Sequence, residues 1–238
     1  MLSLFFVDNL PTEVGQMYEF DNEDAAHAVR VLRIATGEIF NLSDGAGSWS
    51  RVQVVTVGKR SAQVKVLESG YQEPLAVSFT VIQAIPKGDR IKESIELCTE
   101  GGVDQIVMWK AARSIGKSDD KIEKLQVTAR EASKQSRRFR IPQVIGVAST
   151  SIVVDEIAKA DLAIVFHESA TQKVSELVQP GCRNVVIIIG PEGGLTDEEV
   201  NLFAESGAKV ALMGRPVLRS AHAGLAALAA VNTALSVW

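Results

Sequence analysis

The sequence predicts an α/β protein in which a small β-rich domain precedes a larger domain with a mostly parallel sheet. From residue 75 onward, β-branched runs alternate with helix-like segments, as in sheets that carry helices on both faces. Before residue 68, short β-rich runs are separated by glycine turns, which favours a small barrel or curled sheet. Residues 68–74 have the composition of a linker. We therefore expect one domain over residues 1–72 and a second over 73–238.

In the first domain we expect a strand over residues 4–7 and a helix over residues 22–33. Ala25, Ala26, Val29 and Leu32 recur at helical spacing, so they should share the buried face of this helix. Further strands are expected over residues 38–42, 49–57 and 61–67, separated by turns at 43–47 and 58–59.

In the second domain, residues 185–189 form an entirely β-branched run, as expected of a strand buried on both faces. Thr196 and Glu199 form a capping-box pattern that opens a helix over residues 196–206. The other expected strands span residues 77–84, 104–109, 142–147, 161–166 and 209–213, and the other expected helices span residues 89–100, 119–136 and 221–237.

The composition excludes several classes of protein. Hydrophobic residues make up 46% and charged residues 23% of 238 residues, which is ordinary for a globular chain and unlike a disordered one. The net charge of −4 gives no global signature of a nucleic-acid binder. Cys98 and Cys182 are far apart and no CxxC pair exists, so we expect no zinc or other metal site and two buried free thiols.

Neither terminus resembles a targeting or membrane segment. Residues 1–8 lack a positive leader region and are expected to form a strand rather than a signal peptide. The apolar stretch over residues 221–238 is too short and too mixed to span a membrane. We therefore expect a cytoplasmic protein.

Candidate ligand loops follow three of the expected strands, because ligands of such sheets bind at the carboxyl ends of strands. Gly190-Pro-Glu-Gly-Gly194 follows strand 185–189, and its glycines would let the backbone approach a ligand closely. A second glycine loop ends at Arg219, which could face an anion, and His167 and Glu168 follow strand 161–166. A tight turn, a solvated surface arginine and a structural histidine are the competing interpretations.

A local basic segment lies between Lys110 and Arg140. It holds ten Lys or Arg and four Asp or Glu, a net +6, so the rest of the chain carries −10. Such a segment fits a phosphate backbone, and Phe139 among its arginines could stack on a base. The alternative is a solvated basic helix.

An ordered set of motifs resembles the RsmE family, the 16S ribosomal RNA uridine-N3 methyltransferases of the SPOUT class. Gly190–Gly194 and Gly214-x-x-Val-Leu-Arg219 carry this resemblance. Further matches are His27-Ala-Val-Arg-Val-Leu-Arg33, Pro86-Lys-Gly-Asp-Arg90, Glu131-Ala-x-x-Gln-Ser-x-Arg138 and Phe166-His-Glu168.

The resemblance implies an N-terminal PUA-like barrel, a C-terminal SPOUT domain with a trefoil knot, and a homodimer. It also implies S-adenosylmethionine as cofactor and, as substrate, N3 of uridine 1498 in the 16S ribosomal RNA of the small subunit. The cofactor-binding residues that it implies are Phe166, His167, Glu168, Ile189, Gly190, Pro191, Glu192, Gly193, Gly194, Leu212, Met213, Gly214, Val217 and Leu218.

Catalytic and RNA-binding residues follow from the chemistry of this reaction. Arg219 would stabilise the charge that develops on uridine, and Glu192 or His222 would accept the proton of N3. The residues expected to bind RNA phosphates are Arg30, Arg33, Lys87, Arg90, Arg137 and Arg138.

One departure from the family keeps other functions open. Ala221 stands where the family often has an acidic residue. The alternatives are therefore a methyltransferase with another RNA target, or a non-catalytic RNA-binding factor of ribosome assembly. A nucleotide-dependent oxidoreductase is disfavoured, because the chain has no GxGxxG motif.

Overall fold

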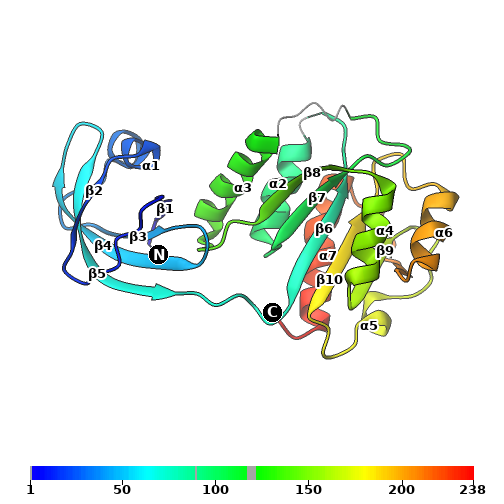
Figure 1. The fold of residues 1–238 in the computed structure, drawn as a ribbon. Coiled ribbons are helices and arrows are strands. Elements are labelled where there is room, and N and C mark those ends of the chain that lie inside the picture. Colours follow the sequence, from blue (N-terminus) through cyan, green and yellow to red (C-terminus); the bar gives the residue numbers. More distant parts are fainter. Residues whose placement is uncertain (1, 89, 117–121) are drawn as a thin grey trace. The chain divides into compact units, whose positions relative to one another are not determined.

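The computed structural model describes residues 2–88, 90–116 and 122–238, which form two units (Figure 1). The first unit contains the residues up to Pro74 together with Ser133–Ile141. The second contains Leu75–Ala132 and Pro142–Trp238. The expected helix starts at residues 89 and 119 lie outside the described residues.

The first unit is built on a five-stranded sheet of order β1-β3-β4-β5-β2. β1 is parallel to β3, and the other pairs are antiparallel. Three phenylalanines, Phe5, Phe20 and Phe40, form the centre of its core, with ring centroids 5.1 to 5.6 Å apart. The strands are β1 (Leu4–Phe6), β2 (Met17–Phe20), β3 (Ile39–Ser43), β4 (Ser48–Val57) and β5 (Ala62–Tyr71).

The helix expected over residues 22–33 changes type in the middle. The Asn22 side chain accepts a hydrogen bond from the Ala25 amide and caps α1 (Glu23–His27), which continues into a π-helix over Ala28–Leu32. A π-turn takes up an extra residue, which rotates the following side chains around the axis. Leu32 is therefore 50% exposed, and its expected place on the buried face is wrong.

Residues 133–141 belong to the first unit, although the expected division at residue 72 assigned them to the second domain. Lys134, near the end of α3 (Ile122–Ser136), donates to Asp24 over 2.7 Å, and both side chains are nearly buried. The Phe139 ring stacks on Trp49 with centroids 5.6 Å apart. The sequence suggested that Phe139 could stack on a base, and in the structure its half-buried ring stacks on Trp49.

Lys134→Met is expected to destabilise the first unit by about 3 kcal/mol, because it removes the ammonium group that lies against the buried Asp24 carboxylate. Urea unfolding followed by tryptophan emission would measure the loss, since Trp49 belongs to this unit. Lys124→Met, an exposed position on the same helix, is the matched control. Equal stability of the two variants would contradict a stabilising role for the ion pair.

The second unit holds a six-stranded parallel sheet of order β11-β9-β10-β6-β7-β8, which confirms the expected α/β class. β10 and β6 lie at its centre, and the β-branched residues of β10 are buried, as expected for a strand with helices on both sides. The strands are β6 (Ser78–Ala84), β7 (Gln105–Trp109), β8 (Gln143–Ala148), β9 (Leu162–Phe166), β10 (Asn184–Ile189) and β11 (Lys209–Ala211).

Helices cover both faces of this sheet (Figure 1). α2 (Arg90–Glu100) and α7 (Ser220–Ala234) pack against each other, and α7 lies on β10 and β6. Gly224 permits this packing, because a Cβ there would lie 2.6 Å from Cys98 Sγ on α2. α4 (Thr150–Lys159) and α6 (Asp197–Glu205) cover the other face, and the short α5 (Val174–Leu177) contacts α7.

The two cysteines are both free, but only one is buried as expected. Burial raises the pKa of the Cys98 thiol to about 12, so this thiol stays protonated at neutral pH. Cys182 is half-buried, and its expected burial is therefore wrong. Among the described residues, none of the helices has the length and apolar character needed to cross a membrane.

Candidate active site

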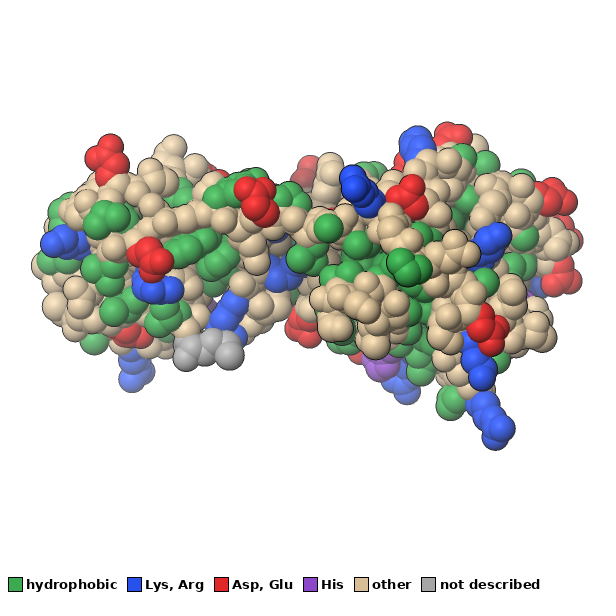
Figure 2. Space-filling view, turned by 90° about the horizontal axis from the view of Figure 1, so that it is seen from below, with side chains coloured by type: hydrophobic (Ala, Val, Ile, Leu, Met, Phe, Trp, Pro, Cys, Tyr) green, Lys and Arg blue, Asp and Glu red, His purple; other side chains and the backbone are tan. Residues whose placement is uncertain are grey.

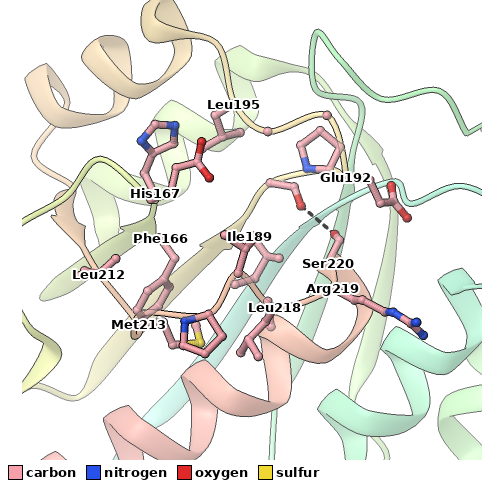
Figure 3. Close-up of a pocket in the computed structure, with 18 of the residues that line it drawn as sticks. Phe166, His167, Ile189, Glu192, Leu195, Leu212, Met213, Leu218, Arg219 and Ser220 are labelled. Carbon is pink, nitrogen blue, oxygen red and sulfur yellow. Dashed lines mark hydrogen bonds between the residues drawn. The ribbon is translucent and has the colours of Figure 1, made fainter.

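A cavity of about 530 Å³ lies in the second unit, at the carboxyl ends of β9, β10 and β11 (Figure 3). All the residues predicted to bind the cofactor line it, as does Arg219. The sequence-based predictions from three separate loops therefore meet at one place. The predicted residues that line the cavity are Phe166, His167, Glu168, Ile189, Gly190, Pro191, Glu192, Gly193, Gly194, Leu212, Met213, Gly214, Val217, Leu218 and Arg219.

The glycine loop after β10 is held by Arg113, which the sequence analysis did not identify. Its Nη1 donates to the carbonyls of Gly193 at 3.2 Å and Leu195 at 3.1 Å. A Cβ at Gly193 would lie 3.2 Å from the Cβ of Arg113, so this close approach favours glycine. Arg113 follows β7, and the strand-end rule applied to that strand would have identified it.

The start of α6 fixes the other end of this loop. Thr196 and Glu199 form the expected capping box, with hydrogen bonds of 3.2 and 2.9 Å. The Glu199 carboxylate is buried and also accepts the amide of Ala112 at 2.7 Å. The loop from Gly190 to Leu195 is thus held between a strand and a capped helix.

The loop after β11 offers peptide groups to a ligand. Leu212 donates to the Gln172 carbonyl over 2.9 Å. From Met213 to Leu218, no backbone group hydrogen-bonds to another backbone group within the described part of the chain. The side chains of Ile189, Leu212 and Leu218 add apolar surface. Apolar faces combined with free peptide groups fit a flat heterocycle with a polar edge, such as adenine.

Glu192 lies on the side of the cavity that also carries Arg219, away from His167 (Figure 3). Its carboxylate accepts the Lys87 amide at 3.2 and 3.3 Å and contacts Arg90 Nη1 at 3.4 Å. Two of the residues predicted to bind RNA, Lys87 and Arg90, are therefore next to the cavity.

His222 is not among the residues that line the cavity. Its Nε2 lies 3.0 Å from Oε1 of Glu93, and both side chains are about half exposed. His222 thus differs from Glu192, the other candidate for the proton acceptor, which does line the cavity. Within the described ranges, no group of three or more His, Cys, Asp and Glu side chains is arranged to hold a metal ion.

The other residues predicted to bind RNA belong to the first unit. Arg30 and Arg33 lie in and directly after the π-helix, and Arg137 and Arg138 lie just after α3. Nε of Arg137 donates to the Leu2 carbonyl at 3.0 Å. On the face that Figure 2 shows, Lys and Arg side chains are interspersed with Asp and Glu.

Two family models match the chain. A model described as an RNA methyltransferase domain matches residues 73–232, and one described as an RNA methyltransferase PUA domain matches residues 20–67. Together they cover most of both units.

Curated relatives carry the name ribosomal RNA small subunit methyltransferase E. The protein of Mycobacterium tuberculosis is 36% identical over 99% of this chain and 93% of its own length. The protein of Bacillus subtilis is 28% identical over 92% of this chain and 91% of its own length.

Solved structures share the fold over almost the whole chain. The ribosomal RNA small subunit methyltransferase E of Neisseria gonorrhoeae, bound to S-adenosyl methionine, superposes with a TM-score of 0.87 at 24% identity, covering 98% of both chains. A protein of Legionella pneumophila, in complex with the bound cofactor SAM, superposes with a TM-score of 0.86 at 26% identity, also covering 98% of both chains.

Proposed function

This chain belongs to the ribosomal RNA small subunit methyltransferase E family, and we propose that it methylates N3 of a uridine in small-subunit ribosomal RNA. The observation that carries this proposal is the convergence of the three predicted cofactor loops on one cavity. By the family resemblance, the target is uridine 1498 of the 16S RNA.

S-adenosylmethionine is the cofactor of this family, and the cavity of this chain fits it. The free peptide groups between Met213 and Leu218 would bind the adenine edge, and Ile189 and Leu218 would pack on its faces. The bound cofactor supplies a methyl group that its sulfonium has already activated. The protein therefore contributes mainly alignment and control of charge on the uridine.

Uridine N3 is a poor nucleophile until it loses its proton. Once N3 has lost its proton, it would be able to accept the methyl group that the cofactor supplies when bound. The Arg219 guanidinium would stabilise the negative charge that spreads over the uracil ring. Of the two candidates for the proton acceptor, only Glu192 lines the cavity, so we assign the role to Glu192.

Glu192→Gln is expected to lower kcat about 100-fold, at the lower end of the effect of general-base catalysis. An amide keeps the size of the side chain and an acceptor for the Lys87 amide, but it cannot take a proton. Single-turnover methyl transfer at saturating cofactor and RNA would measure the effect. His222→Gln, outside the cavity, is the matched control, and a larger loss in this variant would reverse the assignment.

RNA recognition would involve both units. We propose that residues 1–72, together with the segment 133–141 that packs with them, act as a PUA-like RNA-binding domain, and that the remainder of residues 73–238 acts as the SPOUT methyltransferase domain. Arg30, Arg33, Arg137 and Arg138 would bind phosphates at the first unit, and Lys87 and Arg90 would bind them beside the cavity. The target base has to leave its stack in order to enter the cavity.

The finer architecture follows the same family. We propose a trefoil knot in the second unit. The supporting observation is that β11 lies at the edge of the sheet and pairs with β9, while the following helix α7 returns to β10 and β6. In a knotted chain, this return would pass beside the connection that follows β9. We also propose a homodimer, and a location in the cytoplasm, where the ribosomal substrate is found.

A methyl-transfer assay tests the function as a whole. It combines labelled S-adenosylmethionine, the purified protein and small ribosomal subunits from cells that lack the modification, with mass mapping of the product nucleoside. We expect 3-methyluridine at a single site. Cofactor binding without label would indicate another RNA target. Neither binding nor label would favour the non-catalytic alternative, which the Ala221 substitution motivates.

A further inference from the structure

We propose that Gln83 and Ser220 are positioning residues that hold the cofactor loop after β10 against the first turn of α7. The inference rests on the proposed function for its consequence, because the loop and the turn carry the cofactor-binding and catalytic residues. Neither side chain was identified from the sequence. Gln83 is on the central strand β6, and Ser220 directly follows Arg219.

A chain of hydrogen bonds joins these residues in the interior of the second unit. The Gln83 side chain is fully buried, and its Nε2 donates to Ser220 Oγ at 2.9 Å. Ser220 Oγ in turn donates to the carbonyl of Gly190 at 2.7 Å, the bond drawn as a dashed line in Figure 3. We call this chain of two hydrogen bonds, from Gln83 to Ser220 and from Ser220 to Gly190, the relay. It runs from the middle of the sheet to the first residue of the glycine loop.

The partners of Gln83 fix the direction of every bond in this relay. Nε2 also lies 2.9 Å from the Ala84 carbonyl, which can only accept, so the amide nitrogen must point there. The amide oxygen then accepts from Ser94 Oγ at 2.9 Å. Ser220 Oγ therefore accepts a hydrogen bond from Gln83, and its own hydroxyl hydrogen is available to be donated to the Gly190 carbonyl.

The relay connects the two sides of the cavity. Gly190 opens the loop that carries Glu192 and Gly193, and Ser220 opens the helix next to Arg219. Gly224, one turn along α7, lets the helix close over the relay, because a Cβ there would lie 3.7 Å from Oε1 of Gln83 and 2.6 Å from Cys98 Sγ. A buried side chain that links both elements sets their separation, and with it the shape of the cavity.

The test compares Ser220→Ala, Ser220→Thr and Gln83→Met with the wild type in the full-length protein. Ser220→Ala and Gln83→Met should each weaken binding of S-adenosylmethionine about tenfold in calorimetry, the equivalent of one buried hydrogen bond. The double variant should lose no more than the larger single effect, because both changes break the same relay. Ser220→Thr, which keeps the hydroxyl, should restore most of the affinity.

A second readout needs no cofactor. Hydrogen exchange of the amides over residues 190–195 should accelerate about tenfold in Ser220→Ala, because the loop loses its anchor. Ser50→Ala is the matched control: Ser50 is a buried serine whose hydroxyl also donates to a backbone carbonyl, that of Pro11, in the first unit. It should lose similar thermal stability without changing exchange in the loop.

The outcomes separate the relay from the proposed function. A wild type that binds no S-adenosylmethionine would refute the function, and the exchange experiment would still decide the relay. Unchanged exchange and affinity in Ser220→Ala would refute the relay while leaving the function intact. If Ser50→Ala accelerated exchange in residues 190–195 as much as Ser220→Ala does, the effect of Ser220 would be one of general stability. That outcome would also overturn the proposal.

Discussion

Arg219→Ala is expected to lower the rate of methyl transfer about 1,000-fold, the upper range for removal of one group that stabilises developing charge. Arg219 lines the cavity and is the N-cap residue of α7, with extended backbone and no capping bond from its side chain. Its guanidinium is therefore not used by the helix itself. Binding of S-adenosylmethionine should change less than about twofold, since the loss occurs in the transition state.

Single-turnover rates at saturating cofactor and RNA would measure this effect, with calorimetry for the cofactor. Arg215→Ala is the matched control, because Arg215 lines the same cavity from the same loop. Arg219→Lys should recover part of the rate, because lysine restores the positive charge but lacks the planar guanidinium group with its several N–H donors. If Arg219→Ala raised only the KM for RNA and left the rate of methyl transfer unchanged, Arg219 would be an RNA-binding residue and not a catalytic one.

Gly193→Val is expected to weaken cofactor binding by at least about 100-fold, or about 2.7 kcal/mol. A Cβ at this position would lie 3.2 Å from the Cβ and 3.4 Å from the carbonyl oxygen of Arg113, and neither atom can move without its backbone. The added methyl groups of valine would push the loop away from Arg113 and break its two carbonyl contacts. Calorimetry with S-adenosylmethionine is the direct measurement.

Gly193→Ala should give an intermediate loss, because it adds the crowded Cβ alone. Gly214→Val controls for valine in an irregular loop, since a Cβ at Gly214 would meet only Pro216 Cδ, at 4.0 Å. The melting temperature should fall for Gly193→Val and stay near that of the wild type for Gly214→Val. Unchanged cofactor affinity in Gly193→Val would remove this loop from the binding site.

The second unit could be predicted well because its signals are local. Strand β10 consists largely of β-branched residues, and the capping box of α6 needs only Thr196 and Glu199. The short α5 was missed, because four residues cannot form a stable helix without the contacts that α7 supplies. The edge strand β2 was also missed, since only Phe20 among its residues is buried.

The candidate site was predicted from the position of its loops at the ends of strands. The residues that the prediction missed make their contacts with residues far away in the sequence. The strand-end rule located the candidate ligand loops, which follow β9, β10 and β11 and line one cavity. Arg113 and Gln83 act on these loops across 80 or more residues of sequence, so no local pattern indicates their partners. The contact of Phe139 with Trp49 was missed for the same reason, because Trp49 lies in a distant segment.

The place of residues 133–141 in the first unit has a consequence for biosynthesis. Lys134 and Phe139 complete a core whose strands all lie within the first 71 residues. A nascent chain therefore has all five strands of the first sheet but lacks the segment that packs on them until residue 141 has left the ribosome, by which point β6 and β7 of the second sheet have also been made. The N-terminal unit is thus completed only after part of the second unit has been synthesised, so the two units cannot form strictly one after the other in chain order, unlike most domains during translation.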